Sequence, residues 1–176
     1  MEPTYKKAGN LIAMRNLTAT LCLTVAVLLG SAGVSWSADF QKGVDAYNKG
    51  DYATALREWK PFAEQGDALA QFNLGLMYEK GRGVPQDDKT AVKWYRRAAE
   101  QGDAEAQGNL GAMYAFGKGV LKDYVYAHMW GNIAATNGNK LGAKLRDDFE
   151  KKMTSAQIAD AQKLARECVR KNYKGC

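Results

Sequence analysis

Residues 68–103 read ALAQFNLGLMYEKGRGVPQDDKTAVKWYRRAAEQGD, and residues 104–139 read AEAQGNLGAMYAFGKGVLKDYVYAHMWGNIAATNGN. The two stretches align without a gap, so identical residues recur 36 positions apart. The matching positions of the first stretch include Ala70, Gln71, Asn73, Leu74, Gly75, Met77, Tyr78, Gly81, Gly83, Val84, Asp87, Ala91, Trp94, Ala98, Ala99 and Gly102. Such agreement at a fixed period indicates a protein built by stacking copies of one structural unit.

Each copy contains two segments with helical periodicity. The first segment places its apolar residues on one helical face, which is formed by Ala70, Leu74, Met77 and Tyr78. The second carries a broader stripe at i, i+3, i+4, i+7 and i+8, formed by Ala91, Trp94, Tyr95, Ala98 and Ala99. One helix pair cannot bury this stripe alone, so neighbouring pairs must stack.

Glycines and capping residues mark where these helices begin and end. Gly66, Gly102 and Gly138 suit the left-handed conformation that closes a helix. Helix N-caps are expected at Asp51, Asp67, Asp87, Asp103, Asp123 and Asn139, with a capping box at Thr154 and Gln157. The pattern predicts an all-α fold of four antiparallel helix pairs without strands: 39–49 with 52–65, 68–80 with 88–101, 104–116 with 124–137, and 140–151 with 155–170.

Two residue types explain how the pairs pack. Gly75 and Gly111 each cost about 1 kcal/mol inside a helix relative to alanine, which is tolerable where a neighbouring backbone approaches closely. Trp94 and Trp130 are expected to fill the space between pairs, so Trp94→Ala should cost about 3–5 kcal/mol.

The repeat divides the chain into segments. Residues 68–103 and 104–139 are full repeats, and residues 38–67 form a shorter N-terminal partial repeat without the glycine-rich loop. The pattern fades after Lys140, so residues 140–176 are expected to form C-terminal capping helices.

The first residues have the order of a signal peptide. Lys6, Lys7 and Arg15 precede a largely apolar stretch over residues 17–34, and small residues follow it. This predicts a signal peptide over residues 1–37, with Met14 as an alternative start, and an exported protein that is periplasmic or secreted. The alternative is an uncleaved membrane anchor, although the interrupted stretch barely reaches the ~20 residues of a spanning helix. Before cleavage, this segment is the expected membrane contact.

Cleavage would leave two cysteines, Cys168 and Cys176, in an oxidising compartment that permits a disulfide. On one continuous helix they would lie about 12 Å apart, beyond the reach of a disulfide. A bond therefore requires the last helix to end near residues 169–171 and the tail to fold back. Two free thiols are the alternative.

The skeleton resembles the Sel1-like repeat, a relative of the tetratricopeptide repeat. It stands here as Leu74-Gly75-Leu76-Met77-Tyr78, Gly81-Arg82-Gly83-Val84, Asp87, Ala91, Trp94, Ala98-Ala99 and Gly102, and again one period later. The resemblance covers about residues 40–139. It implies a right-handed α-solenoid whose first helices line a concave surface that holds other proteins, as in exported bacterial adaptors.

The resemblance also bears on enzymatic activity. A related cysteine-rich branch, with a cysteine pair in each repeat, is linked with β-lactam binding. No cysteine lies within a repeat here, so that activity is not transferred. We therefore expect a protein-binding scaffold or adaptor that is not an enzyme; the alternatives are a small peptidoglycan- or β-lactam-active enzyme and a spacer without a binding trough.

The expected binding surface lies on the first helices, at positions rotated away from Leu74 and Tyr78. The residues assigned to this concave face are Phe72, Leu76, Glu79, Lys80, Glu105, Ala112 and Phe116. They differ between repeats, unlike the skeleton, and their exposed apolar side chains flanked by charge suit a protein or peptide partner. The alternative is that neighbouring helices cover them.

Other chemistry finds little support in the sequence. The loops Gly81-Arg82-Gly83 and Gly117-Lys118-Gly119 follow no strand and lack the Gly-Lys-Ser/Thr ending of a phosphate loop, which favours a structural turn. The single histidine, His128, occupies a position held by Val92 and Leu56 in the other units, so we expect it to be packed rather than catalytic. Neither a metal site nor a cofactor site is expected. A net charge of +6 favours anionic partners, but an exported chain without interleaved aromatic residues is not expected to bind nucleic acid.

Overall fold

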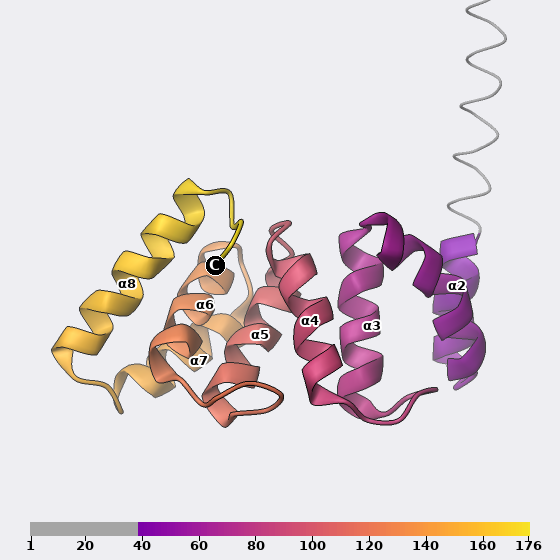
Figure 1. The fold of residues 1–176 in the computed structure, drawn as a ribbon, viewed down its shortest axis with the longest axis horizontal. Coiled ribbons are helices and arrows are strands. Elements are labelled where there is room, and N and C mark those ends of the chain that lie inside the picture. The colour runs from indigo at the N-terminus through magenta and orange to yellow at the C-terminus, as the bar shows by residue number, and fades with distance from the viewer. Residues whose placement is uncertain (1–38) are drawn as a thin grey trace, which may run out of the picture. The chain divides into compact units, whose positions relative to one another are not determined.

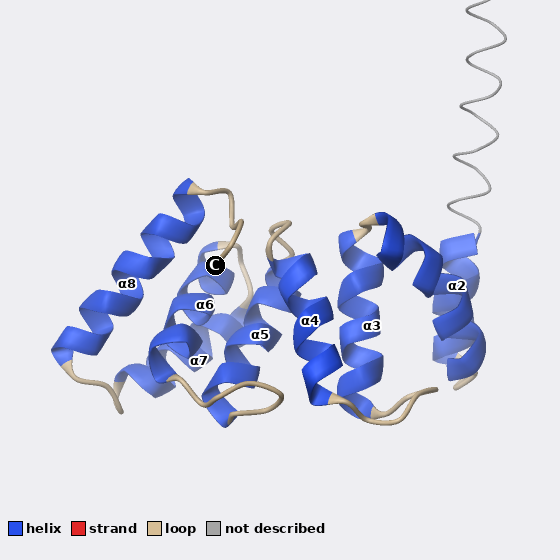
Figure 2. Cartoon of the chain, in the orientation of Figure 1, coloured by secondary structure: helices blue, strands red, loops and turns tan. Residues whose placement is uncertain are grey.

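The computed structural model describes residues 39–176, which form helices and loops without a strand (Figure 2). The predicted signal peptide lies outside the described residues. The chain divides into two units, Met1–Lys42 and Gly43–Cys176. In the first, residues 39–42 are helical.

The second unit is an all-α solenoid in which consecutive helices lie side by side up to residue 150 (Figure 1). In this unit, residues 43–48 form the first helical segment. The helices that follow are α2 (Tyr52–Gln65), α3 (Ala68–Lys80), α4 (Asp88–Ala99), α5 (Ala104–Phe116), α6 (Tyr124–Thr136), α7 (Lys140–Glu150) and α8 (Ser155–Arg170). These bounds agree with the predicted helices to within two residues.

The predicted caps hold these helices. The capping side chain accepts a hydrogen bond from a backbone N–H of the first turn at Asp51, Asp67, Asp87, Asp103, Asp123 and Asn139. Thr154 and Gln157 form the predicted capping box of α8. Gly66, Gly102 and Gly138 adopt positive φ angles of 105°, 92° and 90°. The caps satisfy N–H groups that have no partner within the helix.

The last predicted pair packs differently from expectation. α8 contacts α6 rather than forming a packed hairpin with α7. Ala165 and Cys168 of α8 join the cluster of Met129 and Ile133, whereas Leu145 and Phe149 of α7 join Ala115 and Ala127. The two C-terminal helices therefore cover different parts of α5 and α6.

Glycines in the first helix of each pair leave room for a neighbouring segment, as expected. The neighbouring atoms belong to backbone at one glycine and to a side chain at the other. A Cβ at Gly111 would lie 3.2 Å from the Ala127 carbonyl oxygen and 3.3 Å from the Gly131 nitrogen. A Cβ at Gly75 would instead lie 2.5 Å from the Tyr95 ring. Position 131 of the second repeat corresponds to Tyr95 of the first. The Tyr95 ring therefore occupies the space beside Gly75, whereas the backbones of α5 and α6 pack closely at Gly111.

The two tryptophans also differ. Trp130 is fully buried, at 0% exposure. Trp94 is half-buried, and the Arg97 guanidinium covers its ring at 4.7 Å from the centroid. The prediction that Trp94 belongs to the core is therefore wrong, because the adjacent Tyr95 occupies the buried position in that repeat.

Buried glutamines join successive helix pairs. Gln107, at 0% exposure, donates to the Ala99 carbonyl at 3.1 Å and accepts from Asn137 at 2.8 Å. Gln71 makes the same two bonds one repeat earlier, to the Ala63 carbonyl and from Gln101. These bonds satisfy the ends of the second helices, which explains why glutamine recurs at a core position.

The C-terminal tail folds back on the solenoid (Figure 1). Cys168 and Cys176 form a disulfide with Cα atoms 5.6 Å apart. The turn after α8 passes through Asn172 and Tyr173, both at positive φ. The Asn137 side-chain amide donates to the Tyr173 hydroxyl at 3.2 Å, so the tail is tied to the end of α6.

Candidate functional site

A groove of about 560 Å³ lies between the first helices α5 and α7. We call it the α5–α7 groove. It is lined by Ala112, Phe116, Leu141, Lys144, Leu145, Asp148, Phe149, Lys151 and Lys152. Two residues come from α5, and the others come from α7 and the residues directly after it.

The floor of the α5–α7 groove is apolar and aromatic. The Phe116 and Phe149 ring centroids lie 6.0 Å apart in an edge-to-face arrangement. Phe149 also stacks on Tyr124 at 5.1 Å. Phe116 is 62% exposed and Leu141 is 42% exposed, whereas Phe149 is buried. The groove thus presents exposed apolar side chains on a packed aromatic base.

The rim of the groove is mostly basic. Lys144, Lys151 and Lys152 stand there against Asp148 alone. Lys151 pairs with Asp148 at 3.5 Å, and the Lys152 ammonium lies 5.2 Å from the Phe149 ring centroid. The groove therefore combines an apolar floor with an excess of positive charge, a combination that suits an apolar segment with acidic flanks.

The predicted concave residues separate into three groups. Ala112 and Phe116 line the α5–α7 groove. Phe72 packs against the Tyr95 ring at 6.0 Å, and Leu76 is half-buried. The charged residues Glu79, Lys80 and Glu105 lie outside the groove, and of these Lys80 and Glu105 are exposed.

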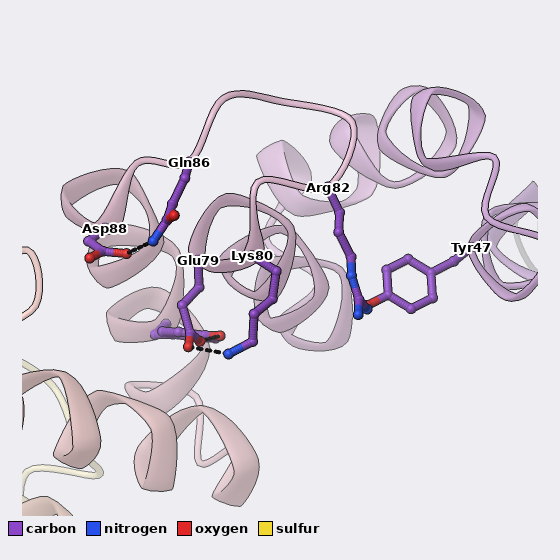
Figure 3. A network of polar contacts seen from close by, with 7 residues as sticks. Tyr47, Glu79, Lys80, Arg82, Gln86 and Asp88 are labelled. Atoms are coloured by element: carbon purple, nitrogen blue, oxygen red, sulfur yellow. Dashed lines mark hydrogen bonds and ion pairs between the residues drawn. The ribbon is translucent and has the colours of Figure 1, made fainter.

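Glu79 is held by hydrogen bonds. Lys80 approaches it at 2.6 Å (Figure 3), and the Tyr95 hydroxyl donates to it at 2.7 Å. Burial raises the pKa of Glu79, but these hydrogen bonds outweigh burial, so the pKa lies below its usual value. Burial and the Glu79 contact raise the pKa of Tyr95. Glu79 therefore anchors the core Tyr95 and is a charged structural residue.

The α7 wall of the groove was not among the predicted site residues. Leu141, Leu145 and Phe149 follow at spacings of four and lie on one helical face. The sequence carries this signal, although the fading of the repeat after Lys140 predicts only a capping role for the segment.

The glycine-rich loops dock on the preceding unit. A Cβ at Gly83 would lie 2.8 Å from the Tyr52 carbonyl oxygen, and one at Gly119 would lie 2.2 Å from the Asp88 carbonyl oxygen. Arg82 donates to the Tyr47 hydroxyl (Figure 3), and its guanidinium lies 5.4 Å from the Tyr47 and Tyr52 ring centroids. These contacts agree with the structural turn expected for the loops.

The single histidine is buried. His128 is 1% exposed, and its Nε2 atom lies 3.7 Å from Glu150 Oε2, beyond hydrogen-bond distance. Burial lowers the pKa of His128, and Glu150 only partly offsets this; Arg146 and Asp147 of α7 also act on it, in opposite directions. The imidazole therefore favours the neutral form in the folded state.

This burial predicts a pH-dependent stability. Because the folded pKa of His128 lies below its unfolded value of about 6.5, the unfolded state takes up a proton first as the pH falls. The free energy that neutral His128 contributes to folding is thus present above the unfolded-state pKa, and it is lost as the pH falls toward the folded pKa. His128→Leu, with the residue type of Leu56 in the equivalent position, should flatten the pH dependence of unfolding between about pH 5 and pH 7. Denaturant titrations of both proteins at several pH values measure this; parallel curves would contradict it.

Two features of the described residues, 39–176, concern metal binding and membrane insertion. These residues hold no group of three or more His, Cys, Asp or Glu side chains that could bind a metal ion. None of their helices is both long and apolar enough to span a membrane.

Sequence comparison identifies the repeat. Residues 68–103 and 104–139 each match the family model of the Sel1 repeat. A 45-residue stretch is 42% identical to the DAP3-binding cell death enhancer 1 of Rattus norvegicus and 40% identical to that of Mus musculus. The match covers 26% of this chain and 9% of each relative.

Solved structures share the fold at substantial sequence identity. One is a protective antigen of uropathogenic Escherichia coli strains with an SLR fold, at 33% identity and a TM-score of 0.73, covering 78% of this chain and 31% of that chain. Another is a Sel1 repeat protein from Oxalobacter formigenes, at 40% identity and a TM-score of 0.57, covering 64% of this chain and 88% of that chain. Solenoids of this kind are generally scaffolds for protein–protein interaction. This chain therefore belongs to the Sel1 repeat family, on the basis of its repeats, its helix order and its likeness to these structures.

Proposed function

We propose that this protein is a non-enzymatic scaffold that binds a segment of a partner protein in the α5–α7 groove. The observation that carries the proposal is Phe116, which is 62% exposed above a packed aromatic base. Exposed aromatic side chains beside a hollow are typical of residues that dominate binding energy. We therefore assign partner binding to the α5–α7 part of the expected concave face.

The chemistry of the groove suggests the bound segment. Its floor favours leucine, isoleucine, phenylalanine or methionine side chains, which an amphipathic helix or an extended segment could supply. Its lysine rim favours acidic residues beside them, since complementary charge steers association and selects partners.

We also propose that the protein is exported, either to the periplasm or out of the cell. Three observations support export: the basic, apolar and small-residue order of the first residues, the Cys168–Cys176 disulfide, and the likeness to a protective antigen of uropathogenic Escherichia coli.

The function is tested by affinity capture with a matched pair of variants. Wild-type protein, Phe116→Ala and Leu121→Ala are used to capture partners from the envelope fraction of the cells that make the protein. Leu121 is a suitable control because it is 90% exposed and apolar but lies outside the groove. We expect Phe116→Ala to lose a partner that wild type and Leu121→Ala both retain. Recovery of the same proteins with all three baits would contradict the groove assignment.

A further inference from the structure

A second surface lies along α4, the second helix of repeat 68–103. It carries positive charge that the single carboxylate of the surface does not balance. A groove of about 460 Å³ along α4 is lined by Lys89, Val92, Lys93, Arg96, Arg97, Glu100 and Gly119. We call it the α4 basic groove. Its four cations face one acidic residue, Glu100, and none of the four lies within ion-pair distance of a carboxylate in residues 39–176.

Two of these cations are already positioned. The Arg96 guanidinium donates to the Tyr114 hydroxyl at 2.6 Å, and the Arg97 guanidinium stacks over the Trp94 ring. Neither contact neutralises the charge. Hydrogen bonds from Thr90 lower the pKa of Asp87 at the start of α4, and the charge of Lys93 adds a smaller effect in the same direction. Fixed guanidinium groups lose less side-chain entropy when they bind a carboxylate in bidentate geometry.

The repeat fold does not require this charge. The corresponding positions of the second repeat are the neutral residues Val125, Met129, Asn132 and Ile133. There, Met129 and Ile133 are buried and share a core cluster with Ala165 and Cys168 of α8. On α4 the equivalent Lys93 and Arg97 are exposed. The same helix face is thus covered by a segment in one repeat and left open and basic in the other.

We propose that the α4 basic groove binds an extended acidic segment of a partner protein. Lys89, Lys93 and Arg97 are spaced at i, i+4 and i+8, which separates neighbouring cations by about 6 Å along the helix axis. Alternate side chains of an extended strand lie about 6.6–6.8 Å apart on one side. A segment with glutamate or aspartate at alternate positions therefore matches the cations one to one.

A narrow peptide fits this surface better than other polyanions. The aromatic rings of Trp94 and Tyr114 beside the cations already have partners. Arg97 lies over Trp94, and Tyr114, whose hydroxyl accepts from Arg96, stacks on Tyr126, so stacking of nucleic-acid bases is not favoured. The cations line a groove along one helix, a shape that suits a single chain rather than a flat lipid surface.

The test uses fluorescence anisotropy with a labelled peptide of alternating glutamate and glycine. Lys93→Gln/Arg97→Gln removes two charges from the groove. Lys163→Gln/Arg166→Gln is the matched control, because it removes two charges from exposed residues of α8. Circular dichroism confirms that each variant is folded. We expect wild type and the α8 variant to bind equally, and the α4 variant to bind at least about tenfold more weakly.

Three results would overturn the proposal: no binding of the peptide by wild type, equal loss in both double variants, or tighter binding of a single-stranded oligonucleotide or of phosphatidylglycerol vesicles than of the peptide. Phe116→Ala should leave peptide binding unchanged, so this test is independent of the α5–α7 groove.

Discussion

Replacing Trp130 with alanine is expected to lower the free energy of unfolding by about 3–5 kcal/mol. Trp130 is fully buried in the cluster that joins α4, α5, α6 and α8. Its removal takes away a large apolar surface and leaves a cavity between helices whose backbones are already in close contact at Gly111 and Gly131. Because such helices cannot move closer together, the cavity should remain largely open.

The matched control for this substitution is Trp94→Ala, one repeat earlier. Trp94 is half-buried and its ring is partly covered by Arg97, so its loss should cost less than half as much. Denaturant titrations of the two variants provide the comparison. Equal destabilisation would mean that the burial difference between the repeats does not govern their stability.

The second large effect is expected for Gly119→Ala, at about 2–5 kcal/mol. Gly119 adopts a φ of +68°, which costs an alanine about 1–2 kcal/mol. A Cβ there would also lie 2.2 Å from the Asp88 carbonyl oxygen and 2.4 Å from its carbonyl carbon. Since backbone cannot rotate away as a side chain can, the loop must shift, and such overpacking costs about 1–3 kcal/mol more.

Gly138→Ala separates the two contributions. Gly138 has a φ of +90°, but no atom lies within 4 Å of its added Cβ. This variant should therefore lose only the conformational part, about 1–2 kcal/mol. Thermal or denaturant unfolding measures both variants. If Gly119→Ala were no less stable than Gly138→Ala, the docking of the glycine-rich loop on the preceding unit would not contribute to stability.

The helices were predictable because their signals are local. The apolar period, the aspartate caps and the closing glycines lie within a few residues of each helix end, and the structure places the helix ends within two residues of the expected positions. The recurrence of Gln71 and Gln107 was also visible, although their hydrogen bonds to Ala63 and Ala99 are made with the preceding helix pair.

What the sequence left open is which neighbour covers each face. Phe72 packs against Tyr95 while Phe116, from the next repeat, stands exposed. The two positions are not equivalent in the repeat, since Phe72 corresponds to Gly108 and Phe116 to Lys80. The Phe116 ring lies against Phe149 of α7 instead. The packing of α8 on α6, rather than on α7, likewise depends on contacts between distant residues. Helical periodicity identifies an apolar face but does not identify its partner.

The central claim is that a partner protein binds in the α5–α7 groove. Measuring the dissociation constant of that complex tests the claim most directly. A partner retained by wild type and by Leu121→Ala is purified and titrated against wild type, Phe116→Ala and Leu121→Ala. Truncation of a dominant interface residue should weaken binding by at least about tenfold, whereas Leu121→Ala should match wild type. Equal dissociation constants for wild type and Phe116→Ala would contradict the claim.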